Sequence, residues 1–231
     1  MSALNSTTPP KATVSWLLLQ LSDSALPTGG FAHSGGLEAA AQQGEVRTAA
    51  DLRRFLRDAL WQAGHCSLPL ASAAHADPAA LPRLDARADA FLVSRVANRA
   101  SRTQGRAFLD TCARIFPAEV AGVRDGARGA GLLLHHAPVA GAVLRALGVE
   151  RTHAQQLLLS LALRGLLFAA VRLGVAGTHE AQRMQYDLAP AMDEVLAACG
   201  DLTEDALAQT APLADLLGST HDRLYSRLFQ S

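Results

Sequence analysis

LLLSLALRGLLFAAVRLGV, residues 157–175, is the part of the chain that most resembles a membrane span. Arg164 and Arg172 interrupt it, and an arginine near the centre of a bilayer is costly. Its leucines and alanines favour a helix over a strand. We therefore predict that it is the buried central helix of a soluble domain, with no membrane partner.

The composition of the 231 residues indicates the same fold class. Aromatic residues make up only 5% of the chain, Ile115 is the only isoleucine, and Lys11 is the only lysine. Strands favour β-branched and aromatic side chains, whereas helices favour alanine, leucine and arginine. We predict an all-α fold, a single compact helical domain of roughly eight to ten helices. It is expected to span residues 15–231, after a flexible N-terminal tail of residues 1–14.

Charge and cysteine usage exclude several classes of partner and compartment. The 21 basic and 21 acidic residues balance, so no overall field favours nucleic acid or an anionic membrane. Cys66, Cys112 and Cys199 are odd in number and form no CxxC pair, which argues against a disulfide framework or a thiolate metal cage. With no visible signal peptide, we expect a cytoplasmic protein.

Prolines, glycines and capping residues predict where helices begin and end. Thr48 and Asp51 predict a helix N-terminus, and Pro69 is expected to bend or end that helix. Pro138 and Gly148 predict the first turn and the end of another helix.

The residues from Pro117 to Gly131 are expected to be the loosest segment outside the termini, because they are rich in glycine. The other predicted interruptions are Gly105 within the long periodic region 84–115, Pro190 in a helix that begins at Thr178, and Pro212 within residues 203–217.

One helix face gathers arginines, at spacings i, i+4, i+7 and i+11: Arg95, Arg99, Arg102 and Arg106. Such a face can bind phosphate or an acidic partner, or it can simply be solvated. Flanking Asp89 and Asp110 favour the solvated interpretation.

The histidines carry no recognisable metal or catalytic motif. His135 and His136 are adjacent, so on a helix their side chains diverge by about 100°. HxxxH, GxxxxGK[ST] and GxSxG motifs are absent from the sequence. We predict no metal site, cofactor site or catalytic residue, and keep as an alternative a metal-dependent enzyme using His33, His135 or His136.

The composition of two segments indicates a role beyond connecting helices. Residues 26–38, LPTGGFAHSGGLE, combine four glycines with an aromatic residue and a histidine, which indicates a shaped recognition turn. Residues 219–231 keep apolar and aromatic side chains to the last positions, where most tails lose them. Each segment is expected either to dock on a partner or to pack on its own core.

These segments carry a resemblance to a known family. LLQLSDSALPTGGFAHSGGLEAA (18–40) and LYSRLFQS (224–231) resemble the UreF family of urease accessory proteins. Weaker similarities lie between them, in the same order: NRASRTQG (98–105), HHAPVAGAVLRALGV (135–149) and RLGVAGTHEAQR (172–183).

The resemblance implies an all-helical, non-catalytic chaperone. It would join the accessory protein UreD (or UreH) and the GTPase UreG on apo-urease and promote GTP-dependent nickel insertion, with nickel and GTP handled by the partner complex. It also implies a homodimer, and terminal segments that order on partner binding. The partner-binding residues it implies are Phe31, His33, Ser34, Tyr225, Ser226, Arg227, Leu228 and Phe229. A different class of function is the alternative: a helical interaction module whose Arg95–Arg106 face binds phosphorylated or nucleic-acid partners.

Overall fold

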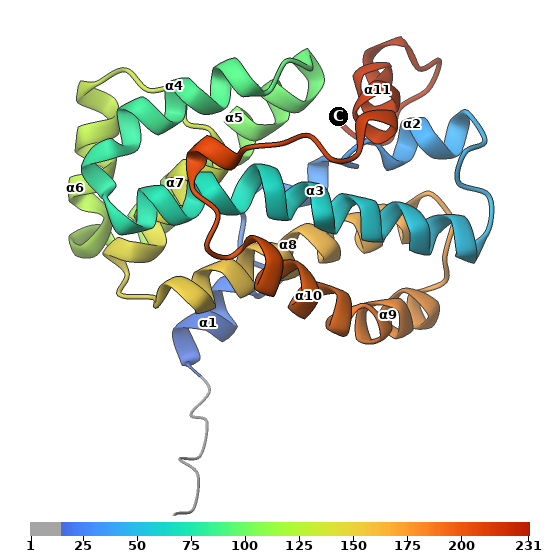
Figure 1. Ribbon diagram of the computed structural model, residues 1–231, viewed down its shortest axis with the longest axis horizontal. Coiled ribbons are helices and arrows are strands. Elements are labelled where there is room, and N and C mark those ends of the chain that lie inside the picture. Colours follow the sequence, from blue (N-terminus) through green and yellow to red (C-terminus); the bar gives the residue numbers. More distant parts are fainter. Residues whose placement is uncertain (1–14) are drawn as a thin grey trace, which may run out of the picture.

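The computed structural model describes residues 15–231, which form helices and turns and contain no strand (Figure 1). The predicted all-α fold is confirmed, with eleven α-helices where eight to ten were expected. The predicted N-terminal tail, residues 1–14, lies outside the described residues. The α-helices are α1 (Trp16–Leu21), α2 (Leu37–Gln42), α3 (Ala49–Ala76), α4 (Leu81–Phe91), α5 (Arg95–Ile115), α6 (Pro117–Gly129), α7 (His136–Ala146), α8 (Arg151–Arg172), α9 (Thr178–Asp187), α10 (Ala189–Cys199) and α11 (Pro212–Ser219). Short 3₁₀ turns occupy Gly30–Ala32, Pro78–Ala80, Glu204–Ala206 and His221–Arg223.

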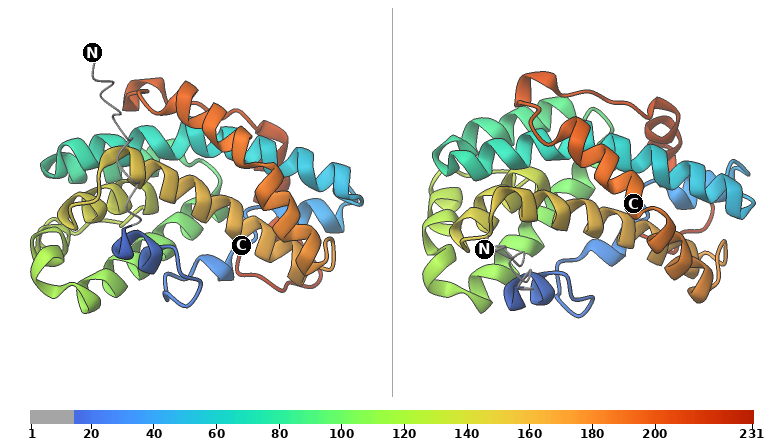
Figure 2. Two further views of the ribbon diagram at one scale, coloured as in Figure 1. Left: turned by 90° about the horizontal axis from the view of Figure 1, so that it is seen from below. Right: turned by 60° about the horizontal axis from the view of Figure 1, so that its bottom comes forward.

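Helix α3 is the central helix of the fold, and α7, α8 and α10 pack directly against it (Figures 1 and 2). Its N-terminus is the predicted capping pair. The Asp51 amide donates to Thr48 Oγ1 at 3.2 Å, and the Thr48 amide donates to Asp51 Oδ2 at 3.1 Å. These bonds satisfy two backbone donors that a helix start leaves free.

Pro69 was expected to bend or end this helix; it does not end α3, which continues to Ala76. A proline lacks the amide that would bond to the carbonyl four residues earlier. That carbonyl belongs to His65, and it accepts instead from the Ala208 amide at 3.3 Å. A segment distant in sequence therefore satisfies the carbonyl that Pro69 leaves free.

Glycines allow close contact between helices. A Cβ at Gly141 of α7 would collide with the carbonyl oxygen of Ala71 in α3, and one at Gly105 of α5 would collide with the carbonyl oxygen of Leu134. The prediction that Gly105 interrupts a helix is therefore wrong, because α5 continues through it. The lack of a side chain at Gly105 instead lets the chain before α7 lie against α5. Pro138 lies in the first turn of α7, as predicted.

Two other predictions about loose or broken segments need correction. The glycine-rich residues 117–131 are mostly helical, because Pro117 fits the first turn of α6 and the chain turns only at Gly131, whose φ is 61°. The periodic region 84–115 is two helices, and Ser94 caps the second by accepting from the Ala97 amide at 3.4 Å.

The remaining prolines act near their predicted positions. The helix that begins at Thr178 is split ahead of Pro190, because α9 ends at Asp187 and α10 begins at Ala189. Pro212 begins α11 rather than breaking a helix, and only a 3₁₀ turn and an extended stretch precede it from residue 203.

Helix α8 contains residues 157–172 of the apolar stretch 157–175. Among the described residues it is the one helix long and apolar enough to cross a membrane, and half of its most apolar 18-residue segment is buried inside the protein. It packs between α3 and the terminal segments, and Leu163 and Leu167 belong to the main core. These contacts are those of a core helix.

Candidate functional site

The turn at residues 26–38, called here the N-terminal turn, owes its shape to glycine. Gly29, Gly35 and Gly36 have φ values of 73°, 58° and 87°, in the left-handed region that other residues rarely adopt. Gly36 also lies against the backbone of Gly218 in α11, 3.2 Å from where its Cβ would be. A side chain at position 36 would therefore push α11 away from the turn.

Residues 219–231, the C-terminal strap, are attached to the N-terminal turn by a buried carboxylate. Glu38 and His221 have side chains with no solvent exposure, and His221 Nε2 lies 2.8 Å from Glu38 Oε2. The backbone amides of Leu228 and Phe229 donate to the same carboxylate at 2.7 and 3.2 Å. Three bonds to one charged group hold the strap in place.

The end of the strap is bonded directly to the N-terminal turn. Ser34 donates to the Ser231 carbonyl oxygen from its amide at 2.5 Å and from its hydroxyl at 3.0 Å. His33 Nδ1 lies 2.6 Å from the Ser231 hydroxyl, and the Gln230 amide donates to the Ala32 carbonyl at 2.8 Å. Burial lowers the pKa of His33, with a smaller effect from nearby Arg99, so its ring is neutral at pH 7.

Aromatic rings join both segments to α8. The Phe31 ring lies 4.4 Å from the Phe168 ring, centroid to centroid, with the Arg164 guanidinium 5.5 Å from Phe31. The Arg172 guanidinium lies 4.6 Å from the centre of the Phe229 ring. Both arginines of the apolar stretch thus have a packing role at this site.

The structure brings the predicted partner-binding residues together but divides them into two groups. Phe229, His33 and Ser34 are buried within the chain, as the alternative of packing on the protein's own core requires. Tyr225 is fully exposed and Leu228 is 57% exposed, on the outer side of the strap.

The other predicted site residues lie at the edges of this group. Phe31 is half-buried, and Ser226 and Arg227 are exposed. The Ser226 carbonyl accepts from Gln42 at 2.9 Å, and Arg227 lies 3.4 Å from the Asp222 carboxylate. The outer surface of the strap is therefore available to a partner while its inner surface is occupied.

The sequence prediction missed Glu38 and His221 as the residues that attach the strap. Glu38 lay inside the quoted turn and His221 inside the quoted tail, but the two are 183 residues apart. Nothing in the spacing linked them. The only sequence signal for this contact was that both segments, the N-terminal turn and the C-terminal strap, contain ionisable residues.

A cavity of about 360 Å³ lies behind the N-terminal turn, bordered by α3, α5, α7, α8 and α11. Leucine and alanine are the commonest residues of its lining, and His136 and Cys66 are among its polar groups. Burial, and secondarily His33, lowers the pKa of His136 to about 4, and burial raises the pKa of Cys66 to about 12. At neutral pH the cavity therefore presents an uncharged imidazole and a thiol, not a reactive thiolate.

The histidines proposed for the alternative enzyme do not converge on one point with other ligands. No group of three or more His, Cys, Asp or Glu side chains within residues 15–231 is placed to hold a metal ion. His135 is held by structural contacts, with its ring nitrogens 3.2 Å from Ser101 Oγ and 3.2 Å from Asp89 Oδ1.

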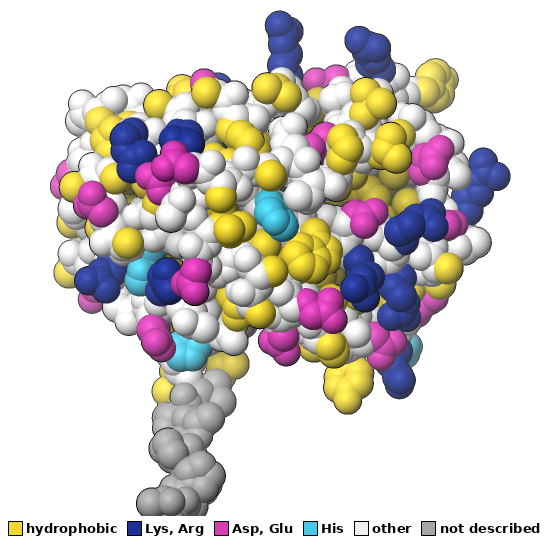
Figure 3. All heavy atoms as spheres, in the orientation of Figure 1, with side chains coloured by type: hydrophobic (Ala, Val, Ile, Leu, Met, Phe, Trp, Pro, Cys, Tyr) yellow, Lys and Arg dark blue, Asp and Glu magenta, His cyan; other side chains and the backbone are white. Residues whose placement is uncertain are grey.

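The predicted arginine face lies on α5 beside the strap. The two terminal nitrogens of the Arg99 guanidinium donate to the two oxygens of Asp222, at 3.0 and 2.8 Å. Elsewhere, basic and acidic side chains are interspersed on the face shown in Figure 3, as expected for a chain without net charge.

Comparison with known proteins identifies the family. A family model described as UreF matches residues 46–189. The urease accessory protein F of Arabidopsis thaliana is 36% identical over 222 residues, which cover 94% of this chain and 92% of that protein. The urease accessory protein F of Oryza sativa subsp. indica is 34% identical over 220 residues, covering 93% and 84%. The urease accessory protein UreF of Mycobacterium tuberculosis is 32% identical over 219 residues, covering 93% and 98%. The chain that folds its C-terminal strap onto its N-terminal turn therefore belongs to the UreF family of urease accessory proteins.

Proposed function

We propose that this chain is a non-catalytic scaffold in urease maturation. It would join a UreD-type (UreH-type) accessory protein and a UreG-type GTPase on apo-urease, in the cytoplasm, and promote GTP-dependent delivery of nickel to the urease active site. Nickel is the cargo of this assembly, and GTP is the substrate of the GTPase. A homodimer of the chain within the complex is part of the proposal.

The observation that carries the proposal is family membership over more than nine-tenths of the chain. The strap supports it independently. Tyr225, Leu228 and Arg227 form an exposed surface on a segment whose inner side is fixed by Glu38. Tyrosine and arginine are the residues most often found to dominate binding energy, and a surface already in place loses little conformational entropy on binding.

The test is co-expression of the chain with its UreD-type, UreG-type and urease partners, omitting one component at a time. Nickel content and urea hydrolysis of the purified urease are measured. The proposal expects nickel-poor, inactive urease whenever this chain is omitted. Equal activation without it would refute the proposal.

A point variant locates the contact. Because Tyr225 is fully exposed, Tyr225→Ala leaves the fold intact, but loss of a binding hot spot costs about 2 kcal/mol, equivalent to about a thirtyfold weaker complex. Tyr186→Ala is the matched control, because Tyr186 is 76% exposed and belongs to α9, not to the strap. Equal co-purification by both variants would exclude Tyr225 from the interface.

Arg227→Ala tests the charged part of the same surface. Arg227 is exposed and its single ion pair, with Asp222, is long, so the melting temperature should change little while assembly weakens. Unchanged activation of urease by Arg227→Ala would remove Arg227 from the proposed site.

A further inference from the structure

The arginine face of α5 forms a groove next to the strap. Four guanidinium groups occupy one side of the helix over about 16 Å, given the rise of an α-helix. The groove encloses about 870 Å³, and its lining includes Leu92, Val93, Asn98 and Thr103 as well as the arginines. Val93 is 78% exposed, so the groove offers apolar contact as well as charge.

One carboxylate already occupies this face. Asp222, from the strap, makes a two-pronged ion pair with Arg99, with bonds of 3.0 and 2.8 Å. This contact lowers the pKa of Asp222 and raises that of Arg99. A segment that is distant in sequence thus binds to the face through a carboxylate, in the planar geometry that guanidinium groups favour.

The other three arginines have no such partner. Arg95, Arg102 and Arg106 form no ion pair with any side chain of residues 15–231. The neighbouring acidic groups Asp89 and Asp110 form no ion pair with them. The Asp89 carboxylate is engaged by Asn98 Nδ2 at 2.9 Å and by His135 at 3.2 Å. Asp110 follows Arg106 by one turn, the less favourable order for a helical ion pair.

We propose that this groove binds an acidic segment of a partner protein. Carboxylates of that segment would pair with Arg95, Arg102 and Arg106, as the Asp222 carboxylate pairs with Arg99. The groove is suited to a protein rather than to a nucleic acid for two reasons. Asp89 and Asp110 lie in its lining and would repel a phosphate backbone, which is charged at every nucleotide, whereas a peptide can place uncharged residues beside them. The exposed Val93 would pack against an apolar side chain of a peptide. The inference does not depend on the identity of the partner or on the proposed function.

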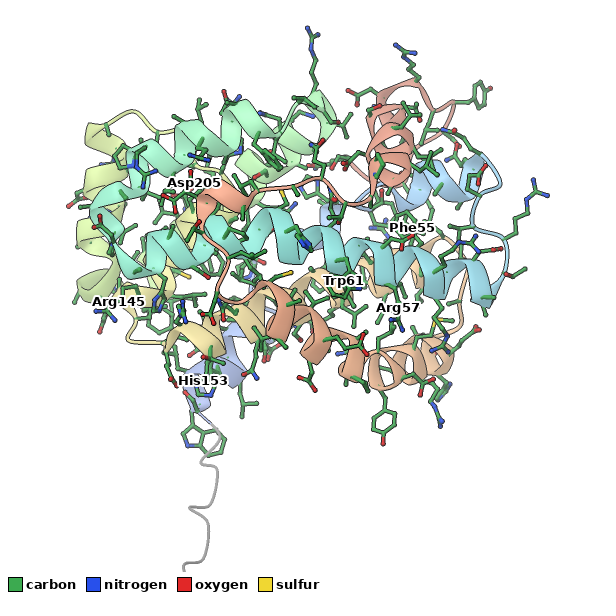
Figure 4. The ribbon with its side chains drawn as sticks, in the orientation of Figure 1. Phe55, Arg57, Trp61, Arg145, His153 and Asp205 are labelled. Carbon is green, nitrogen blue, oxygen red and sulfur yellow. The ribbon has the colours of Figure 1, made fainter. Side chains whose placement is uncertain are left out.

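The test uses the full chain and a fluorescein-labelled acidic peptide with glutamates and leucines interspersed, followed by fluorescence polarisation. The variant is R102E/R106E. The matched control, R128E/R145E, makes the same charge change at two exposed arginines on α6 and α7 that form no ion pair within residues 15–231, and Figure 4 shows Arg145 away from α5. Circular dichroism melts verify that each protein is folded. R102Q/R106Q, which only removes charge, replaces the reversal if the reversal unfolds the chain.

The proposal expects that R102E/R106E weakens peptide binding about tenfold or more, while the control stays within about twofold, and that binding falls with salt. Three results would overturn it. One is no binding of the peptide by the unmodified chain at low salt. Another is equal weakening by the variant and its control. The third is displacement of the peptide by single-stranded RNA or a phosphoserine peptide at lower concentration than by the unlabelled acidic peptide, which would assign the face to phosphate.

Discussion

Glu38→Gln should release the C-terminal strap without unfolding the helical core. The substitution keeps the size of the side chain but removes the charge that accepts from His221 and from the amides of Leu228 and Phe229. An amide oxygen can accept only part of this set, and its NH₂ group faces donors instead of acceptors.

The magnitude follows from the three bonds. A buried hydrogen bond to a charged group contributes about 1.5–3 kcal/mol, and a glutamine retains part of that total. The loss should therefore be about 3 kcal/mol in the free energy that holds the strap closed. Because each 1.36 kcal/mol is a factor of ten, the open population should rise about a hundredfold. None of the hydrogen bonds of this carboxylate is to α3, α7 or α8, so the stability of the core that these helices form should change far less.

Hydrogen exchange measures the opening at the amides concerned. The Leu228 and Phe229 amides should lose about a hundredfold in protection, given 1.36 kcal/mol per decade, while amides of α3 keep theirs. Trypsin should also cut after Arg227 faster in the variant. Glu45→Gln is the control, because Glu45 is exposed and makes no hydrogen bond through its side chain within the described residues. Protection of Leu228 and Phe229 within about threefold of the control would refute the assignment of Glu38 as the anchor of the strap.

Two further predictions concern pH and packing. The pKa of His136 is lowered to about 4 and that of His33 is also lowered, so both are neutral in the folded chain at pH 7. The contribution of these two histidines to the free energy of unfolding should be constant above the unfolded pKa of about 6.5 and should fall as the pH drops from there toward 4. Urea titrations of His136→Gln should show a shallower fall over this range than the unmodified chain. Gly105→Ala should destabilise the fold by about 3 kcal/mol or more, because the new Cβ would meet the Leu134 carbonyl. Gly126→Ala in α6, where the space is open, should stabilise the fold by about 0.5–1 kcal/mol. Equal melting temperatures for the two variants would contradict this packing.

The parts of the fold that were predictable from sequence are those set by neighbours in the chain. The composition indicated helices, and the Thr48–Asp51 capping pair is fully local. The behaviour of Pro69 was not predictable, because the donor that satisfies the His65 carbonyl comes from Ala208, in a distant loop. The same reason explains Gly105, whose local effect is to weaken a helix but whose tertiary role is to admit a neighbouring backbone.

The candidate site was predictable in its members but not in its arrangement. Both segments were selected because their composition exceeded what a loop or a tail requires. Their contact with each other depends on Glu38 and His221, which no local pattern joins. That contact decides which face of the strap points outward. The sequence alone therefore could not show that Tyr225 is exposed and Phe229 is buried.

The attachment of the strap also has a consequence for the order in which this protein is made. Glu38 emerges from the ribosome before the groups that bond to it, which follow more than 180 residues later. Contacts of such long sequence separation form late and slow the folding of a chain. The Glu38 carboxylate therefore cannot make these bonds until residues 221–229 have been synthesised, and the outer surface of the strap is fixed only after that point. A chain that stops before residue 221 would lack the groups that bond to Glu38, so closure of the strap distinguishes such a chain from one that contains them.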